Sequence, residues 1–244
     1  MRAAPRLSGW LCSVICLFSI GCANAPGHPA PGPEVPRPDQ VLDFATLYRQ
    51  NCAACHGATG KNGAALALAN PVYLAFAGQD NVRRTAANGV AGKLMPAFAK
   101  SAGGTLTDAQ IDSLVGGIFR SWSRPDILTA SPPPPYQAAQ PGNSAQGQTA
   151  FAGFCARCHG PGGTGSPNIV RGAIADPAFL ALISDQNLRS TIVGGRPDLG
   201  MPNWRSITSG TPASPITDRQ ITDIVAWLAT QRMPYPGQGY VTKE

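Results

Sequence analysis

The sequence predicts an all-α protein made of two small domains of the same kind in tandem. Three observations support this prediction: an internal repeat, helix-start signals at matching places in the two copies, and a proline-rich segment between the copies. The chain of 244 residues is long enough for two small domains with apolar cores. Its 28 glycines and 24 prolines lead us to expect loop-rich domains joined by stiff connections.

The repeat begins with two matching segments, YRQNCAACHG at 48–57 and FAGFCARCHG at 151–160. These segments align at an offset of 103 residues, and later positions align at 106 and then at 110. The second copy therefore has three extra residues after its cysteine motif and four after its methionine, as expected of loops in duplicated domains. Matched positions include Leu74 and Leu180, Arg83 and Arg189, Met95 and Met201, and Thr107 and Thr217.

Helices are predicted at both ends of each copy. Apolar residues at 41, 44, 45 and 48 have helical spacing, which predicts a helix that starts near Asp39 and runs into the first cysteine motif. The segments LTDAQI and ITDRQI, near the end of each copy, have the pattern of capping boxes that start a last helix. The predicted N-caps are Thr107 and Thr217, and the side chains of Gln110 and Gln220 are expected to accept hydrogen bonds from the backbone N–H of these caps. The expected hydrophobic staples are the contacts of Leu106 with Ile111 and of Ile216 with Ile221.

The N-terminus has the features of an export signal. Arg2 and Arg6 precede an apolar run that is too short for a comfortable membrane span. The run ends in SIGC, which resembles a bacterial lipobox, so we expect Cys22 to be acylated and to become the mature N-terminus. The alternative is ordinary cleavage after Ala25, although Pro26 is a poor residue beyond a cut. We expect an exported protein that is lipid-anchored on the periplasmic side of a bacterial membrane.

These signals define the expected organisation of the chain. The segments are a signal peptide at 1–21, a proline-rich tether at 22–38, a first domain at 39–126, a proline-rich linker at 127–142, a second domain at 143–233 and a tail at 234–244. The linker, which contains SPPPPYQAAQPG, is expected to be an extended polyproline spacer. The 19 basic and 13 acidic residues show no basic tail, so no nucleic-acid partner is expected.

Four of the seven cysteines remain when the signal and Cys22 are set aside: Cys52, Cys55, Cys155 and Cys158. In an exported protein, four cysteines would usually form two disulfides. Here each pair is C-x-x-C followed by histidine, the spacing that attaches c-type haem: two thiols add to the porphyrin vinyl groups, and the imidazole then lies beneath the iron. A chain of this length and composition would contain far fewer than one such motif by chance, and this chain contains two. We expect two covalently bound haem c groups, with His56 and His159 as iron ligands.

From Asp39 to Met233 the chain resembles a tandem of two class I cytochrome c domains, and the two C-x-x-C-H motifs carry this resemblance. The resemblance implies a small helical domain around each haem and a distal methionine on a loop. It also implies that the first and last helices of a domain cross closely, with a small residue on one and an aromatic residue on the other. The second copy has Gly147 and Trp227 at these positions, whereas the first has Phe44 and Gly117, so the large and small residues have exchanged helices.

The second axial ligand of each iron is expected to be a methionine. The chain has only three histidines, of which two are proximal ligands and His28 lies in the tether, so two bis-histidine haems are impossible from this chain alone. Met95 and Met201 each precede a proline at matched positions, 39 and 42 residues beyond their histidines, and the family places its distal methionine on such a loop. Met233 has no counterpart and is expected to pack at the end of the last helix.

Two further expectations follow from the resemblance. In the family a proline after the motif often supplies the carbonyl that orients the histidine; Pro167 offers it in the second copy, whereas the first copy has Ala64 at the aligned position. Arg83 and Arg189 are candidates for contacts with haem propionates, with surface solvation as the alternative.

A haem with imidazole and thioether ligands has a raised potential and no open position for a substrate. We therefore expect a membrane-tethered dihaem electron carrier rather than an enzyme. Its partners would be electron-donor and electron-acceptor proteins, between quinol-oxidising complexes and a terminal acceptor in a respiratory or photosynthetic chain. One alternative is a fixed cytochrome subunit of a membrane redox complex. Another is a dihaem enzyme, such as a peroxidase or an enzyme that oxidises sulfur compounds.

Overall fold

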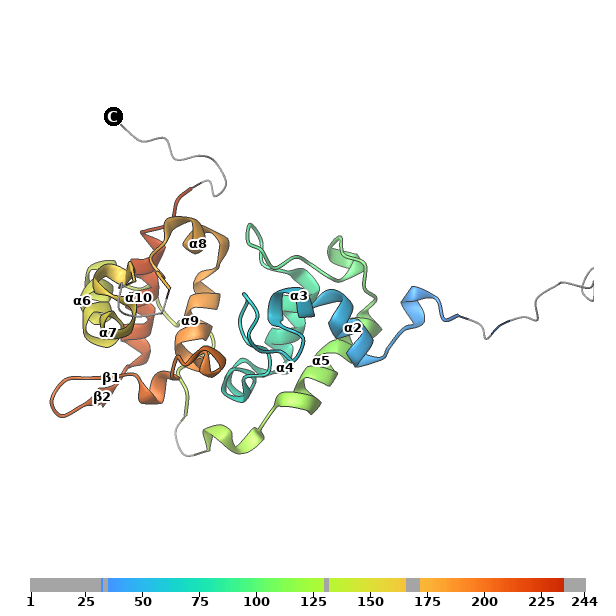
Figure 1. Ribbon diagram of the computed structural model, residues 1–244, viewed down its shortest axis with the longest axis horizontal. Coiled ribbons are helices and arrows are strands. Elements are labelled where there is room, and N and C mark those ends of the chain that lie inside the picture. Colours follow the sequence, from blue (N-terminus) through green and yellow to red (C-terminus); the bar gives the residue numbers. More distant parts are fainter. Residues whose placement is uncertain (1–31, 33–34, 130–131, 166–171, 235–244) are drawn as a thin grey trace, which may run out of the picture. The chain divides into compact units, whose positions relative to one another are not determined.

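The computed structural model describes residue 32 and residues 35–129, 132–165 and 172–234. The predicted signal peptide, Cys22 and most of the tether lie outside the described residues. The described residues from 39 to 234 form one compact unit. The fold of the described part is helical, as predicted, and Figure 1 shows the order of its elements.

The first copy contains a short helix pair at the cysteine motif, a long central helix and a final helix. Its elements are η2 Pro38–Gln40, α2 Phe44–Asn51, α3 Ala53–His56, α4 Pro71–Asn88, η3 Lys100–Ala102 and α5 Asp108–Trp122, followed by η4 Pro125–Leu128. The central helix α4 is kinked at Gly78, whose backbone is not helical. At the aligned position of the second copy, Ser184, the chain has two separate helices instead of one.

The second copy repeats this order. Its elements are α6 Ser144–Phe154, α7 Ala156–His159, η5 Pro161–Gly163, α8 Pro177–Leu182, α9 Asp185–Gly194, η6 Pro197–Leu199, η7 Trp204–Ser206, β1 Thr208–Ser209, β2 Ser214–Pro215 and α10 Asp218–Ala229. The two short strands pair antiparallel between the methionine and the last helix, where the alignment requires four extra residues. The last helix ends at Ala229, so Met233 lies beyond it and not at its end as we expected.

The predicted capping boxes are confirmed in both copies. Thr107 and Thr217 accept hydrogen bonds from the third backbone N–H of their helices, and the glutamines return the bond. The predicted start of the first helix is wrong. Asp43, not Asp39, caps α2, because its carboxylate accepts the N–H of Thr46 at 2.8 Å, while Asp39 lies in the short helix η2.

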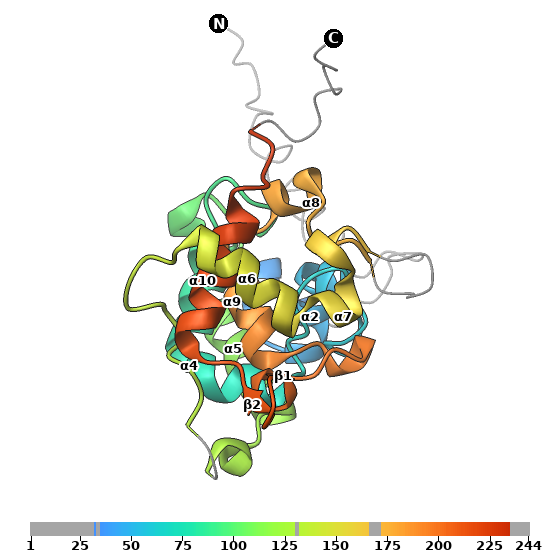
Figure 2. The same cartoon turned by 90° about the vertical axis from the view of Figure 1, so that its left-hand side faces the viewer.

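The first and last helices of each copy cross through a glycine. A Cβ placed on Gly117 would overlap the ring of Phe44, and a Cβ on Gly147 would overlap the backbone carbonyl of Asp223 and Cβ of Trp227. The expected exchange of large and small residues is therefore confirmed, and Phe44 is half-buried against the first core. Figures 1 and 2 show α6 packed across α10 at the second of these crossings.

The two copies share packing, so the linker is more than the extended spacer that we expected. Val72 of α4 belongs to the core of the second copy, and Phe76 packs against both cores. The ring of Tyr136, in the linker, lies 6.0 Å from the ring of Phe76, measured between centroids. The carbonyls of Pro135 and Tyr136 accept hydrogen bonds from Arg189 of α9.

Asn70 joins a helix of one copy to a helix of the other. Its Oδ1 accepts the N–H of Val72 at 3.0 Å and so caps α4. Its Nδ2 donates to the carbonyls of Gly194 at 2.9 Å and Gly195 at 3.1 Å, at the C-terminal end of α9. One buried side chain thus satisfies backbone groups at the start of one helix and at the end of another.

The expectation that Arg83 and Arg189 contact haem propionates is corrected, because both are engaged with the last helix of their copy. Arg83 Nε lies 2.6 Å from a carboxylate oxygen of Asp112, and Arg189 pairs with Asp218. The two arginines differ in burial: the side chain of Arg83 is 40% exposed and that of Arg189 is 3% exposed.

This difference predicts unequal effects on stability. Arg189→Ala should lower the free energy of unfolding by about 2 kcal/mol, because Asp218 and the carbonyl of Pro135 lose a buried charged donor. Arg83→Ala at the aligned position should leave stability nearly unchanged, because its ion pair is solvated. Denaturant unfolding of both variants measures this, and equal losses would contradict the prediction.

Candidate haem-binding sites

The two cysteine motifs have the same local structure. The first helix of each copy ends one residue before the first cysteine, which is its C-cap, and a four-residue helix then carries the second cysteine and the histidine. All four cysteines are free thiols. Burial raises the pKa of Cys52 to about 11 and that of Cys155 to about 12, and the second cysteine of each motif adds to the shift. Two free thiols beside one imidazole, twice, fit covalent attachment of two haem c groups.

His56 is held in an orientation that suits an iron ligand. Its Nδ1–H donates to the carbonyl of Leu66 at 2.7 Å, which leaves Nε2 as the nitrogen available to a metal. Burial lowers the pKa of His56, the Leu66 bond opposes this shift, and the Arg196 guanidinium adds to it. The result favours the neutral imidazole that binds a metal.

The carbonyl that orients His56 could not be found from the sequence. Ala64 stands where the second copy has Pro167, and Leu66, two residues further on, supplies the acceptor instead. A backbone carbonyl is present at every residue, so no residue type marks it. Pro167 lies outside the described residues, and its predicted contact with His159 stays a prediction.

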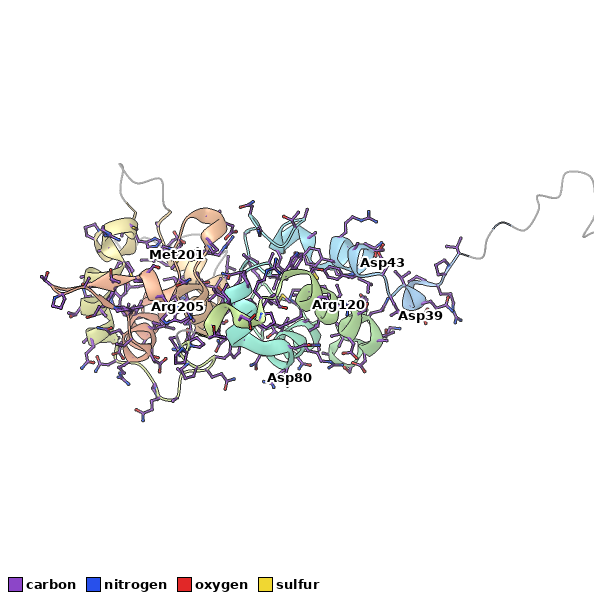
Figure 3. All side chains as sticks on the ribbon, turned by 90° about the horizontal axis from the view of Figure 1, so that it is seen from below. Asp39, Asp43, Asp80, Arg120, Met201 and Arg205 are labelled. Atoms are coloured by element: carbon purple, nitrogen blue, oxygen red, sulfur yellow. The ribbon has the colours of Figure 1, made fainter. Side chains whose placement is uncertain are left out.

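The two methionines lie on loops of the same design. The N–H of Val90 donates to the carbonyl of Met95 at 2.9 Å, and the N–H of Arg196 donates to the carbonyl of Met201 at 3.0 Å. Each loop rests on the glycine that ends the preceding helix: a Cβ on Gly89 or on Gly195 would overlap the backbone that follows the methionine. Figure 3 labels Met201 on the second of these loops. Both methionines are half-buried, and their ligation of iron stays a prediction.

The structure therefore describes all eight predicted haem residues: Cys52, Cys55, His56 and Met95 in the first copy, and Cys155, Cys158, His159 and Met201 in the second. In the described part of the chain no group of three or more His, Cys, Asp or Glu side chains could hold a separate metal ion. The same part has no helix with the length and apolar character needed to cross a bilayer. Cys22, the predicted lipidation site, is not among the described residues.

Two family models match the chain, one in each copy. Residues 39–116 match the family described as "Cytochrome C oxidase, cbb3-type, subunit III". Residues 144–232 match the family described as "Cytochrome c". Together the two matches cover the cysteine motif and the methionine loop of both copies.

Similar proteins cover both copies. The cbb3-type cytochrome c oxidase subunit CcoP of Azospirillum sp. (strain B510) is 28% identical over 70% of this chain and 60% of its own length. The corresponding subunit FixP of Bradyrhizobium sp. (strain ORS 278) is 31% identical over 70% of this chain and 58% of its own length. A chain of the Kuenenia stuttgartiensis reducing HAO-like protein complex superposes with a TM-score of 0.47 at 17% identity, covering 82% of this chain and 100% of that one. The chain spans less than two thirds of the length of the curated relatives that it matches.

Proposed function

Because the chain belongs to the c-type cytochromes, with two class I domains in tandem and so two covalent haem c groups, we propose that it relays single electrons between membrane-associated redox proteins. The observation that carries the proposal is the duplication of a complete site: each copy has two free thiols, a histidine after the second, and a methionine on a loop of matching design. Duplicated sites of one kind suit a relay better than two unlike centres would.

Each residue has a distinct task in this proposal. Cys52 and Cys55, and likewise Cys155 and Cys158, would hold a haem by thioether bonds. His56 and His159 would be the proximal ligands, and Met95 and Met201 the distal ones. Haem supplies the one-electron chemistry of its iron. The protein would fix the ligands, as the Leu66 carbonyl orients His56, and a bound methionine would leave no coordination position for a substrate.

The site of action follows from the N-terminus. We propose that Cys22 is acylated, so that the proline-rich tether holds the haem domains at the periplasmic face of a membrane. A single acyl chain binds membranes only marginally, so stable attachment requires at least two. Mass spectrometry of the mature N-terminus tests this part: a chain that starts at Pro26 would refute it.

A fixed subunit of a membrane redox complex is the second candidate. It is favoured by the relatives, which are named as subunits of a cbb3-type cytochrome c oxidase. Purification from native membranes distinguishes the two. A relay protein should be released alone by mild detergent, whereas a subunit should stay with a larger complex of constant stoichiometry.

A redox titration tests the relay itself. We expect two one-electron transitions at positive potentials, low-spin spectra for both haems, and no carbon monoxide binding by the reduced protein. Rapid carbon monoxide binding together with turnover of peroxide or of a sulfur compound would replace the relay with a dihaem enzyme.

A further inference from the structure

A buried ion pair lies on the methionine loop of the second copy. Arg196 donates to both carboxylate oxygens of Asp198, from Nε at 3.1 Å and from Nη2 at 2.9 Å. The side chain of Arg196 is 11% exposed and that of Asp198 is 3% exposed. A pair buried to this degree requires further hydrogen bonds to offset the loss of hydration.

Those further bonds come from the first copy. Nη2 of Arg196 also donates to the carbonyl of Gly63 at 3.0 Å. In return, the N–H of Asn62 donates to Oδ2 of Asp198 at 2.9 Å. Asn62 has a φ of 60°, a left-handed conformation that asparagine tolerates better than most residues and that directs its N–H at the carboxylate.

Gly63 is in turn fixed against the first haem-attachment motif. A Cβ at this position would overlap the backbone of Cys55 and His56. The next turn of the loop is tied to the same place, because the N–H of Ala65 donates to the carbonyl of Cys55 at 2.9 Å. The carbonyl that receives Arg196 therefore belongs to a loop packed on the motif that holds the first haem.

The backbone of Arg196 is paired with Met201. It donates to the Met201 carbonyl at 3.0 Å, and its own carbonyl accepts the Met201 N–H at 2.9 Å. The same residue thus contacts the first haem-attachment loop with its side chain and the distal ligand of the second haem with its backbone. The first copy has Val90 and Gly92 at the positions of Arg196 and Asp198, so the pair is not part of the repeated scaffold.

We propose that Arg196, oriented by Asp198, is a positioning residue that holds the Met201 ligand through the first domain, and so couples the two haem sites. The proposal rests on the proposed function for the role of Met201 as a ligand. The planar fork of arginine can reach Asp198 and Gly63 together, which the point charge of lysine cannot do in the same geometry.

The test uses the full holoprotein and three variants. Arg196→Val introduces the residue of the first copy, and Arg196→Lys keeps the charge but not the fork. Arg219→Val is the matched control, because Arg219 also pairs with an aspartate, Asp223, but its other hydrogen bond goes to the linker carbonyl of Pro141 and not to the first domain. Two quantities are measured: the affinity of imidazole, which displaces methionine from ferric haem, and hydrogen–deuterium exchange of peptides covering 57–66.

Both Arg196 variants should bind imidazole at the second haem about tenfold more tightly, because the methionine competes less well once its supporting contacts are lost. Exchange within 57–66 should rise in the same variants, since the Asn62 N–H loses an ordered acceptor. Arg219→Val should change neither quantity. Unchanged imidazole affinity, or increased affinity without faster exchange in 57–66, would overturn the coupling.

Failure of the proposed function would look different. If Met201 is not a ligand, the unmodified oxidised protein shows a sulfur-to-iron charge-transfer band from one haem only. The Met201→Ala variant then binds imidazole with the same affinity as the unmodified protein. The exchange measurement does not depend on ligation, and unaltered exchange in both Arg196 variants rejects the link between the domains by itself.

Discussion

Met201→Ala should convert the second haem from a six-coordinate, low-spin site into one with an open distal position. The reduced variant should bind carbon monoxide at one haem, and the potential of that haem should fall by roughly 0.1–0.3 V, a part of the range of about 0.8 V over which axial ligands set haem potentials. The cause is the loss of a soft thioether that favours Fe(II). Met95→Ala should have the same effect on the first haem.

Met233→Ala is the control for this prediction. Met233 is half-buried beyond the last helix, and the contact that fixes it is made by its backbone N–H, which donates to the Pro177 carbonyl at 3.3 Å. Its replacement should leave both potentials unchanged and no haem open to carbon monoxide. A Met201→Ala variant that remains low-spin with an unchanged potential would show that another group binds the iron.

Phe44→Gly should destabilise the first domain by roughly 3 kcal/mol, the lower end of the range for aromatic deletions in cores, because the ring is half-buried. Phe44 packs over Gly117 and also meets the rings of Tyr48 and Trp122, with centroids 5.7 Å and 5.8 Å away. Its removal leaves a cavity at the helix crossing that these rigid neighbours cannot fill. Denaturant unfolding of the holoprotein gives the loss.

The double variant Phe44→Gly with Gly117→Trp tests whether volume is the cause. It gives the first crossing the residues of the second, where Gly147 packs on Trp227. At least half of the lost stability should return, whereas Gly117→Trp alone should be destabilising because the new ring and Phe44 compete for one space. A double variant that is no more stable than Phe44→Gly would contradict the volume argument.

The sequence was sufficient for features that depend on residue type at fixed spacing. The two capping boxes have local signatures, whereas the crossing glycines were expected from the family resemblance, and the structure confirms both. The start of α2 was not predicted correctly, because Asp39 and Asp43 are both acceptable caps and only packing selects the second. The buried face of α2 includes Leu47, whereas Ala45, which was part of the predicted apolar spacing, is exposed.

The contacts between the copies could not be predicted, because they join side chains to backbone groups of distant residues. Arg196 reaches the carbonyl of Gly63, and Lys93 reaches the carbonyl of Ala181 at 2.7 Å. Neither carbonyl is marked by a residue type. The same reason explains why the linker was expected to be a simple spacer, when the carbonyl of Tyr136 in fact accepts hydrogen bonds from α9.

The junction at Asn70 is a heterologous contact, since the start of a helix in one domain meets the end of a helix in the other. Contacts of this head-to-tail kind can propagate when every copy offers both surfaces. At the position aligned with Asn70, the second domain has Asp176, which caps α8 by accepting the Phe179 N–H at 2.7 Å. A carboxylate caps a helix as well as an amide does, but when ionised it has no hydrogen to donate. The difference between these two side chains makes the junction one-directional: at this position the second domain cannot receive a further helix end.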